Sequence, residues 1–281
     1  MNLRKLLNSG IIIALLFTAA CNNSEQTKKD IQEIDNRMPR SYKEENVFYE
    51  GDSATMNGFV VYDQNDSTAR PAVLVVHEWW GLVDYSKMRA RELASLGYVA
   101  MAIDMFGNGD TATNPQQAMK ATAPYYNDPQ KAKRRFDAAI AKLKTYSQVD
   151  PNKIAAIGYC FGGTQVLNMA KLGEDLKAVV SFHGGLPGIT PAKDVTKAKI
   201  LVCHGGDDKF VSQAQVDQFR KSLDSVGVSY TFKVYAGATH AFTNPLSDEN
   251  GKKFKLPIAY NPAADTASWN DMKKFFDQNL K

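Results

Sequence analysis

The sequence has few cysteines, no long block of one charge and no apolar run of membrane-spanning length. Only three of its 281 residues are cysteine, too few for the disulfide framework of a small secreted domain. The formal net charge is +4, and because its basic residues are not clustered, no nucleic-acid partner is expected. The chain is 44% hydrophobic and 23% charged, which is typical of a globular protein.

The first twenty residues have the features of an export signal. Arg4 and Lys5 give the chain a positive start, and the run from Ile11 to Phe17 is uninterrupted and apolar. That run is too short to cross a membrane comfortably. We therefore predict a secretory signal peptide over residues 1–20.

Small residues stand directly before Cys21. The sequence Thr18-Ala19-Ala20-Cys21 resembles the lipobox of bacterial lipoproteins, although leucine is more usual where Thr18 stands. The resemblance implies a bacterial source, cleavage before Cys21, lipid attached to its thiol, and a domain in the periplasm or at the cell surface. A plain signal peptide cut nearby is the alternative.

Residues 21–45 are polar and rich in charge, with few large apolar side chains. This composition predicts a flexible tether. Residues 46–281 show no internal repeat and no sign of a second domain, so we expect one folded domain there.

In residues 46–281, mostly apolar strands alternate with helices. Continuous apolar runs indicate strands buried on both faces, and the alternation predicts an α/β sandwich with helices on both faces of a mostly parallel sheet. An antiparallel pair at 47–49 and 56–62 is expected at its edge. Further strands are predicted at 72–76, 98–103, 153–157, 178–182, 199–203 and 230–235. Helices are predicted at 85–96, 129–146, 162–171, 213–226 and 266–279.

One strand-to-helix turn stands out. Gly158-Tyr159-Cys160-Phe161-Gly162-Gly163 has the pattern of the nucleophile elbow of α/β-hydrolases, with cysteine in the usual place of serine. The central residue of such a turn is strained, so its neighbours must lack side chains. The thiol would stand at the positive end of a helix, which favours a thiolate. The alternative is an ordinary glycine-rich turn holding a small buried cysteine.

An acid and a base follow this turn in the order found in α/β-hydrolases. Asp208 and His240 each come just after a predicted strand, at the edge where parallel sheets build their sites. A thiol attacks a carbonyl well only as a thiolate, so an imidazole must take its proton, and a carboxylate must orient that imidazole. His240 is the predicted base and Asp208 the predicted orienting acid.

Nearby residues of the same types have simpler interpretations. Asp207 is interpreted as a residue whose side chain stabilises a turn. His204 is expected to stabilise its turn through hydrogen bonds. Cys203 lies within an apolar strand and is interpreted as a core residue. His183 ends a strand on the same edge and is a candidate for the pocket wall.

Taken together, these motifs resemble the dienelactone hydrolase family. The resemblance runs from about Val47 to the end and includes Tyr260-Asn261-Pro262 and Trp269. It is carried by His77-Glu78-Trp79-Trp80-Gly81, the turn at Cys160, Asp208-Lys209-Phe210-Val211 and Thr239-His240-Ala241-Phe242.

The resemblance implies a hydrolase of small esters or lactones. Cys160 would be the nucleophile, forming an acyl-cysteine intermediate. Backbone N–H groups of Phe161 and Trp79 would hold the oxyanion. Glu78 corresponds to a carboxylate that approaches the thiol and controls its protonation; the alternative is a carboxylate that caps its loop. No metal or organic cofactor is implied, and a monomer is expected.

The sequence departs from the family at the substrate. Two arginines that grip a substrate carboxylate in the namesake enzymes correspond to Asn108 and Asn244 here. Without these charges, a neutral or differently charged ester or lactone is equally compatible with the sequence. An apolar, aromatic wall is predicted from Trp79, Trp80, Phe106 and Phe242.

Two other function classes remain open from the sequence. The protein could be a surface-anchored protein of the same fold that binds a ligand without catalysing a reaction. A metal site is the other class, yet no His-Glu-x-x-His spacing is present. Its candidate ligands are His77, Glu78, His204, Asp207 and Asp208.

Overall fold

A computed structural model describes residues 40–280. The predicted signal peptide, the predicted lipidation site Cys21 and most of the predicted tether lie outside the described residues. The tether was predicted to reach residue 45, but the first strand already begins at Tyr42. Residues 42–45 pair with β2 in a regular antiparallel register, so the folded domain begins earlier than predicted.

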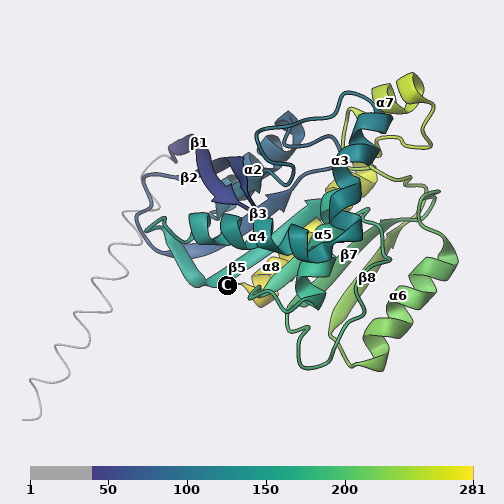
Figure 1. Cartoon of the computed structure of the whole chain (residues 1–281). Helices are drawn as coiled ribbons and strands as arrows, with labels where there is room; N and C mark the ends of the chain where they lie inside the picture. The colour runs from purple at the N-terminus through teal and green to yellow at the C-terminus, as the bar shows by residue number, and fades with distance from the viewer. Residues whose placement is uncertain (1–39, 281) are drawn as a thin grey trace, which may run out of the picture.

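Eight strands form one twisted sheet in the described part of the chain (Figure 1). Their order across the sheet is β1-β2-β4-β3-β5-β6-β7-β8. β1 and β2 are antiparallel, as is the β2–β4 pair, whereas all pairs from β4 to β8 are parallel. The strands are β1 (Tyr42–Gly51), β2 (Ala54–Asp63), β3 (Arg70–Val76), β4 (Val99–Ile103), β5 (Val149–Tyr159), β6 (Ala178–Phe182), β7 (Lys199–Gly205) and β8 (Tyr230–Tyr235).

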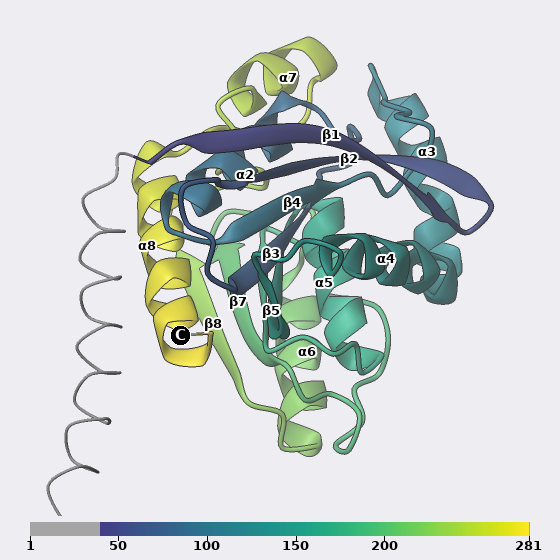
Figure 2. The ribbon, with the colours of Figure 1, turned by 90° about the vertical axis from the view of Figure 1, so that its left-hand side faces the viewer.

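Helices cover both faces of the sheet, which confirms the predicted α/β architecture. Helices α4, α5 and α6 lie on one face, and α2 and α8 lie on the other (Figure 2). The helices are α2 (Asp84–Ser95), α3 (Pro115–Asn127), α4 (Pro129–Leu143), α5 (Phe161–Lys171), α6 (Gln213–Ser225), α7 (Ser247–Phe254) and α8 (Pro262–Asn279). Across residues 40–280, none of the helices is both long and apolar enough to span a membrane.

The register of β3 explains why its sequence is continuously apolar. Leu74 packs in the same core as Phe136 of α4, whereas Val75 packs with Leu93 of α2 and Phe276 of α8. Successive side chains of a strand point to opposite faces. Both faces of β3 are covered, so every position along the strand needs an apolar residue. Full burial of one such side chain contributes about 1.5–3 kcal/mol to the free energy of unfolding.

Two helices near the edge of the sheet were not predicted. In α3, the Asn114 side chain caps the first turn by accepting a hydrogen bond from the Gln117 N–H. Pro124 lies inside this helix, and a proline at such a position in a sequence normally indicates that a helix ends. α7 is polar, contains a glycine and buries only Ser247. The internal proline of α3 and the eight-residue length of α7 conceal these helices in the sequence.

Candidate active site

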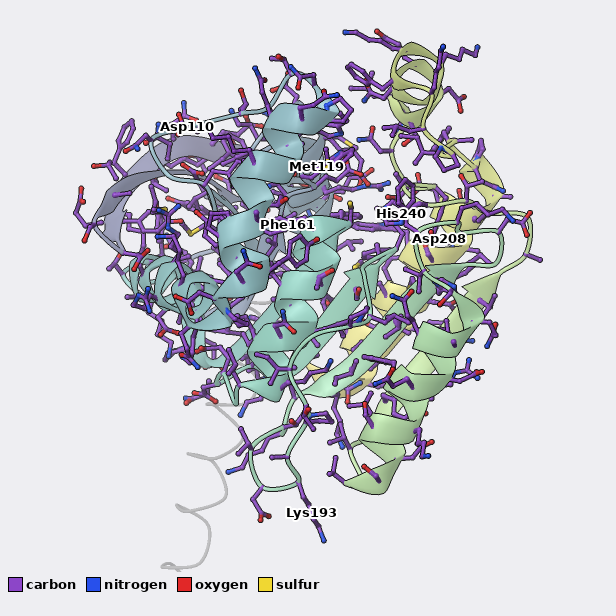
Figure 3. All side chains as sticks on the ribbon, turned by 45° about the vertical axis from the view of Figure 1, so that its right-hand side comes forward. Asp110, Met119, Phe161, Lys193, Asp208 and His240 are labelled. Atoms are coloured by element: carbon purple, nitrogen blue, oxygen red, sulfur yellow. The ribbon has the colours of Figure 1, made fainter. Side chains whose placement is uncertain are left out.

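The predicted site lies where parallel strands end. The turn at His77–Trp80 follows β3, Cys160 follows β5, Asp208 follows β7 and His240 follows β8. Parallel strands direct the loops after their carboxyl ends to one edge of the sheet. This topology brings together residues far apart in the sequence (Figure 3).

The turn at Cys160 has the strained geometry predicted from its glycines. Cys160 has φ 52° and ψ −113°, outside the regions that L-residues readily adopt. A Cβ on Gly158 would lie 2.1 Å from the carbonyl oxygen of Gly162, and one on Gly162 would lie 2.3 Å from that of Val76. Only glycine permits this approach of strand and helix.

Two acceptors hold the strained residue in place. The Cys160 N–H points to the Phe182 carbonyl oxygen at 3.0 Å and to Nδ1 of His183 at 3.1 Å. His183 is fully buried, and burial lowers its pKa well below the usual value. Its ring is therefore neutral, with Nδ1 as the acceptor.

Cys160, His240 and Asp208 form one hydrogen-bonded chain. Nε2 of His240 lies 3.1 Å from the Cys160 Sγ, and Nδ1 lies 2.8 Å from Oδ2 of Asp208. The other carboxylate oxygen of Asp208 accepts the N–H of Phe210 at 2.8 Å. The imidazole can thus take the thiol proton at one nitrogen while its other nitrogen stays oriented.

The surroundings of His240 stabilise its protonated form. Burial acts to lower the pKa of His240, but the neighbouring Cys160 and the hydrogen bond to Asp208 raise it, and the net pKa is about 10. Burial also acts to raise the pKa of Asp208, yet His240 and the Phe210 N–H bring it below its usual value. The acid therefore remains ionised.

Two backbone amides are candidate donors, one from the residue after Cys160 and one from Trp79, which lines the same cavity as Cys160. Phe161 is the first residue of α5, so its N–H has no acceptor within the helix. Trp79 lies in the turn after β3, and its N–H donates to no backbone oxygen of residues 40–280.

A cavity of about 230 Å³ opens beside the thiol. Its wall includes several predicted site residues, among them Trp80 and Asn244. Neither lysine nor arginine of the described residues lines it. Tyr126 comes from α3 and Asn250 from α7, the two helices that the sequence did not reveal. The lining residues are Glu78, Trp79, Trp80, Tyr126, Cys160, Gly185, Phe210, Val211, His240, Ala241, Asn244, Ser247, Asn250 and Ile258.

Four residues predicted for the pocket do not line this cavity. Phe106 is buried against His77, and Phe242 is fully buried against His183. His183 itself lies beneath the turn that it supports. Asn108 is exposed in the loop after β4, so its correspondence to a substrate-binding arginine finds no support in the cavity.

Glu78 contacts Asn244 rather than the thiol. The Asn244 side-chain amide donates a 2.6 Å hydrogen bond to Oε2 of Glu78, while no hydrogen bond joins Glu78 to Cys160 in the described chain. Burial raises the pKa of Glu78 to about 7, although the bond from Asn244 acts to lower it.

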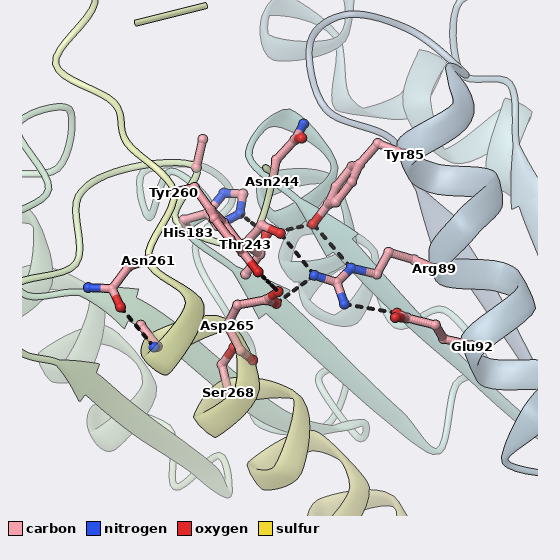
Figure 4. A network of polar contacts seen from close by, with 12 residues as sticks. Tyr85, Arg89, Glu92, His183, Thr243, Asn244, Tyr260, Asn261, Asp265 and Ser268 are labelled. Atoms are coloured by element: carbon pink, nitrogen blue, oxygen red, sulfur yellow. Dashed lines mark hydrogen bonds and ion pairs between the residues drawn. The ribbon is translucent and has the colours of Figure 1, made fainter. Parts of the chain in front are cut away.

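A buried polar network lies below the site (Figure 4). Nε2 of His183 lies 2.7 Å from the Thr243 hydroxyl, which lies 2.6 Å from the Tyr85 hydroxyl. Arg89 donates to the Thr243 carbonyl oxygen at 2.9 Å and to Asp265 at 2.5 Å. The network ties the turn at Cys160 and the segment after His240 to α2 and α8. No sequence motif pointed to Arg89 or Thr243.

The candidate metal ligands serve other purposes. Nδ1 of His77 lies 2.5 Å from the Glu78 carbonyl oxygen, and its Nε2 accepts the Met105 N–H at 3.1 Å. His204 packs against Phe232, and Asp207 is exposed. Within residues 40–280, no three His, Cys, Asp or Glu side chains are placed to hold a metal ion.

Most of this chain resembles known proteins. Residues 56–280 match the family model described as the dienelactone hydrolase family. The chain belongs to the dienelactone hydrolase family. Membership makes it a carboxylic ester hydrolase of the α/β-hydrolase fold, as predicted, and does not favour the binding-protein alternative.

Individual proteins that resemble this member of the dienelactone hydrolase family show how far the likeness extends. A putative carboxymethylenebutenolidase of Aquifex aeolicus is 31% identical over 84% of this chain and 98% of its own length. Protein usf of Aquifex pyrophilus is 33% identical over 75% and 89%. The crystal structure of a dienelactone hydrolase-like promiscuous phosphotriesterase from metagenomic libraries is 33% identical with a TM-score of 0.80, covering 86% of this chain and all of that one.

Proposed function

We propose that the protein hydrolyses a small ester or lactone through the thiol of Cys160. The observation that carries the proposal is the continuous hydrogen-bonded chain from Sγ through His240 to Asp208. An imidazole that touches a thiol on one side and a buried carboxylate on the other is the arrangement that covalent acyl transfer requires.

The reaction proceeds in two halves. His240 takes the thiol proton, the thiolate attacks the carbonyl carbon, and the oxyanion is held by the N–H groups of Phe161 and Trp79. The adduct collapses to an acyl-cysteine as His240 gives its proton to the leaving alkoxide. In the second half His240 takes a proton from water, the resulting hydroxide attacks the acyl group, and the acid leaves as the thiol is restored.

The wall of the cavity favours a substrate without a negative charge. Among the described residues neither lysine nor arginine lines it, and the Glu78 carboxyl would repel an anionic group once ionised. Trp79 and Trp80 pack edge to face at 5.0 Å, and Phe210 completes an aromatic wall. We therefore propose neutral esters or lactones with an apolar acyl group, in place of the carboxylate-bearing lactone.

The test is hydrolysis of p-nitrophenyl acetate and of p-nitrophenyl hydrogen succinate. Wild-type protein should hydrolyse the neutral acetate with the higher kcat/KM, and both activities should vanish on alkylation with iodoacetamide and in Cys160→Ala. Activity that persists in Cys160→Ala would overturn the cysteine mechanism. A preference for the succinate would overturn the substrate class alone.

We also propose that Cys21 carries a lipid that holds the domain in the bacterial cell envelope. The small residues before Cys21 and the polar segment after it support this proposal. In cells, Cys21→Ser should move the protein from the membrane fraction to the soluble fraction. An unchanged distribution would rule out anchoring through this residue.

A further inference from the structure

A second cavity lies between the end of α5 and the face of α6. Its volume is about 220 Å³, and it shares no lining residue with the cavity at Cys160. The segment from Leu186 to Pro191 forms one wall. The lining residues are Lys171, Leu186, Pro187, Gly188, Ile189, Thr190, Pro191, Gln215, Gln218, Phe219 and Ser222.

Among residues 40–280, Lys171 is the only charged side chain that lines this cavity, and it is 4% exposed. Its Nζ lies 5.0 Å from the centre of the Phe219 ring. No hydrogen-bond acceptor or carboxylate of residues 40–280 contacts the amine. The nearest acid along the chain, Glu174, is engaged by Lys133 at 2.6 Å. An ammonium buried without a counter-ion is costly, so such residues usually have a partner.

Burial is the sole cause that shifts the pKa of Lys171, which falls to about 8. The amine is therefore still largely protonated at neutral pH, and it faces the cavity as an unpaired cation. The ring of Phe219 offers a weak cation–π contact only.

The wall opposite Lys171 is held in place by the fold. Asn168 of α5 is buried, and its Oδ1 accepts the Ile189 N–H at 3.4 Å. A Cβ on Gly188 would lie 2.4 Å from that same oxygen. Pro187 and Pro191 restrict the backbone on either side. The cavity is thus a built feature rather than a gap beneath a loose loop.

The chemistry of the lining selects the ligand. The side-chain amides of Gln215 and Gln218 supply N–H donors for an anionic head group. The Leu186, Ile189 and Phe219 side chains supply an apolar surface for the rest of the molecule. We propose that this cavity binds a small organic monocarboxylate, whose carboxylate pairs with Lys171 and whose apolar body packs on Phe219.

Inorganic phosphate fits this cavity less well. It is strongly hydrated, exists as both monoanion and dianion at neutral pH, and has no apolar part to cover the hydrophobic wall. A single ammonium would neutralise only part of the charge of the dianion. A monocarboxylate matches both the one positive charge and the apolar surface.

The experiment titrates the protein with sodium benzoate, benzamide and inorganic phosphate by isothermal calorimetry. Benzoate should bind with one site dependent on Lys171, whereas benzamide, of equal shape but neutral, should bind at least tenfold more weakly. Lys171→Met should weaken benzoate at least tenfold. Lys221→Met removes an exposed lysine of α6 and should leave the affinity unchanged.

A second measurement uses the wild-type protein and so does not depend on how a variant folds. Saturating benzoate should slow acetylation of Lys171 by acetic anhydride, followed by mass spectrometry, without slowing that of Lys221. Benzoate affinity equal in wild type and Lys171→Met, or no protection of Lys171, would overturn the proposal. Phosphate binding as tightly as benzoate through Lys171 would overturn the assignment to carboxylates.

Discussion

The Asn244 side chain donates a hydrogen bond of 2.6 Å to the buried carboxyl group of Glu78, 166 residues away in the sequence. The donor is neutral, so it cannot offset the cost of burying a negative charge as a cation would. Burial accordingly keeps the pKa of Glu78 at about 7, although its ordinary value is 4.5. The cavity beside Cys160 therefore contains a carboxyl group that changes charge near neutral pH.

Glu78→Gln should stabilise the protein above pH 7 and change little below pH 4.5. The folded-state pKa is raised, so stability contributed by the neutral carboxyl is complete below the unfolded pKa and is lost as pH rises through about 7. The loss is on the order of 3 kcal/mol. Urea unfolding of both proteins at pH 4, 6 and 8 measures it. Glu249→Gln, at an exposed site on α7, is the control; parallel pH profiles for wild type and Glu78→Gln would contradict the prediction.

Asp208→Asn should lower kcat/KM for p-nitrophenyl acetate by roughly 10³- to 10⁴-fold while leaving the fold intact. An amide can hold His240 in the wrong tautomer and cannot stabilise its cationic form. Asp207→Asn is the matched control, because Asp207 is exposed while its neighbour Asp208 is buried. Equal activity in the two variants would show that Asp208 does not orient His240.

Gly158→Ala should destabilise the protein by more than about 3 kcal/mol, since the new methyl group would overlap the Gly162 carbonyl. Denaturation by urea would report the change. Gly206→Ala is the milder comparison, because the nearest atom to its Cβ is the Tyr235 carbonyl oxygen at 3.1 Å. A fully stable Gly158→Ala protein would mean that the strand and helix can separate at this turn.

Arg89→Met should cost about 3–5 kcal/mol of unfolding free energy, because it leaves the Asp265 carboxylate half-buried without its cation. Adding Asp265→Asn should restore part of the loss, as a double-mutant cycle in urea would show. Arg91 lies on the same helix as Arg89 and forms an exposed ion pair with Glu44. Arg91→Met removes that ion pair and should cost no more than about 1 kcal/mol of unfolding free energy. Similar losses in Arg89→Met and Arg91→Met would contradict the role assigned to the buried network.

The sequence by itself determined the sheet and the grouping of Cys160, Asp208 and His240 at one edge of it. Continuous apolar runs such as β3 reveal buried strands because both of their faces need apolar residues. The glycines around Cys160 indicate a strained turn because no other residue fits there. Asp208 and His240 could then be placed near Cys160, since parallel strands direct their following loops to one edge of the sheet.

Tertiary structure alone decided what surrounds those groups. Phe106 and Phe242 were expected in the pocket wall but lie in the core, because hydrophobicity predicts burial without saying whether a ligand or another side chain covers the ring. Tyr126 and Asn250 line the cavity from α3 and α7, which an internal proline and a short length conceal in the sequence. Asn244 contacts Glu78 because two segments remote in the chain lie side by side. The burial of Lys171 beside a cavity likewise depends on how segments remote in the chain pack. Both arrangements are fixed only when the sheet and its helices pack together.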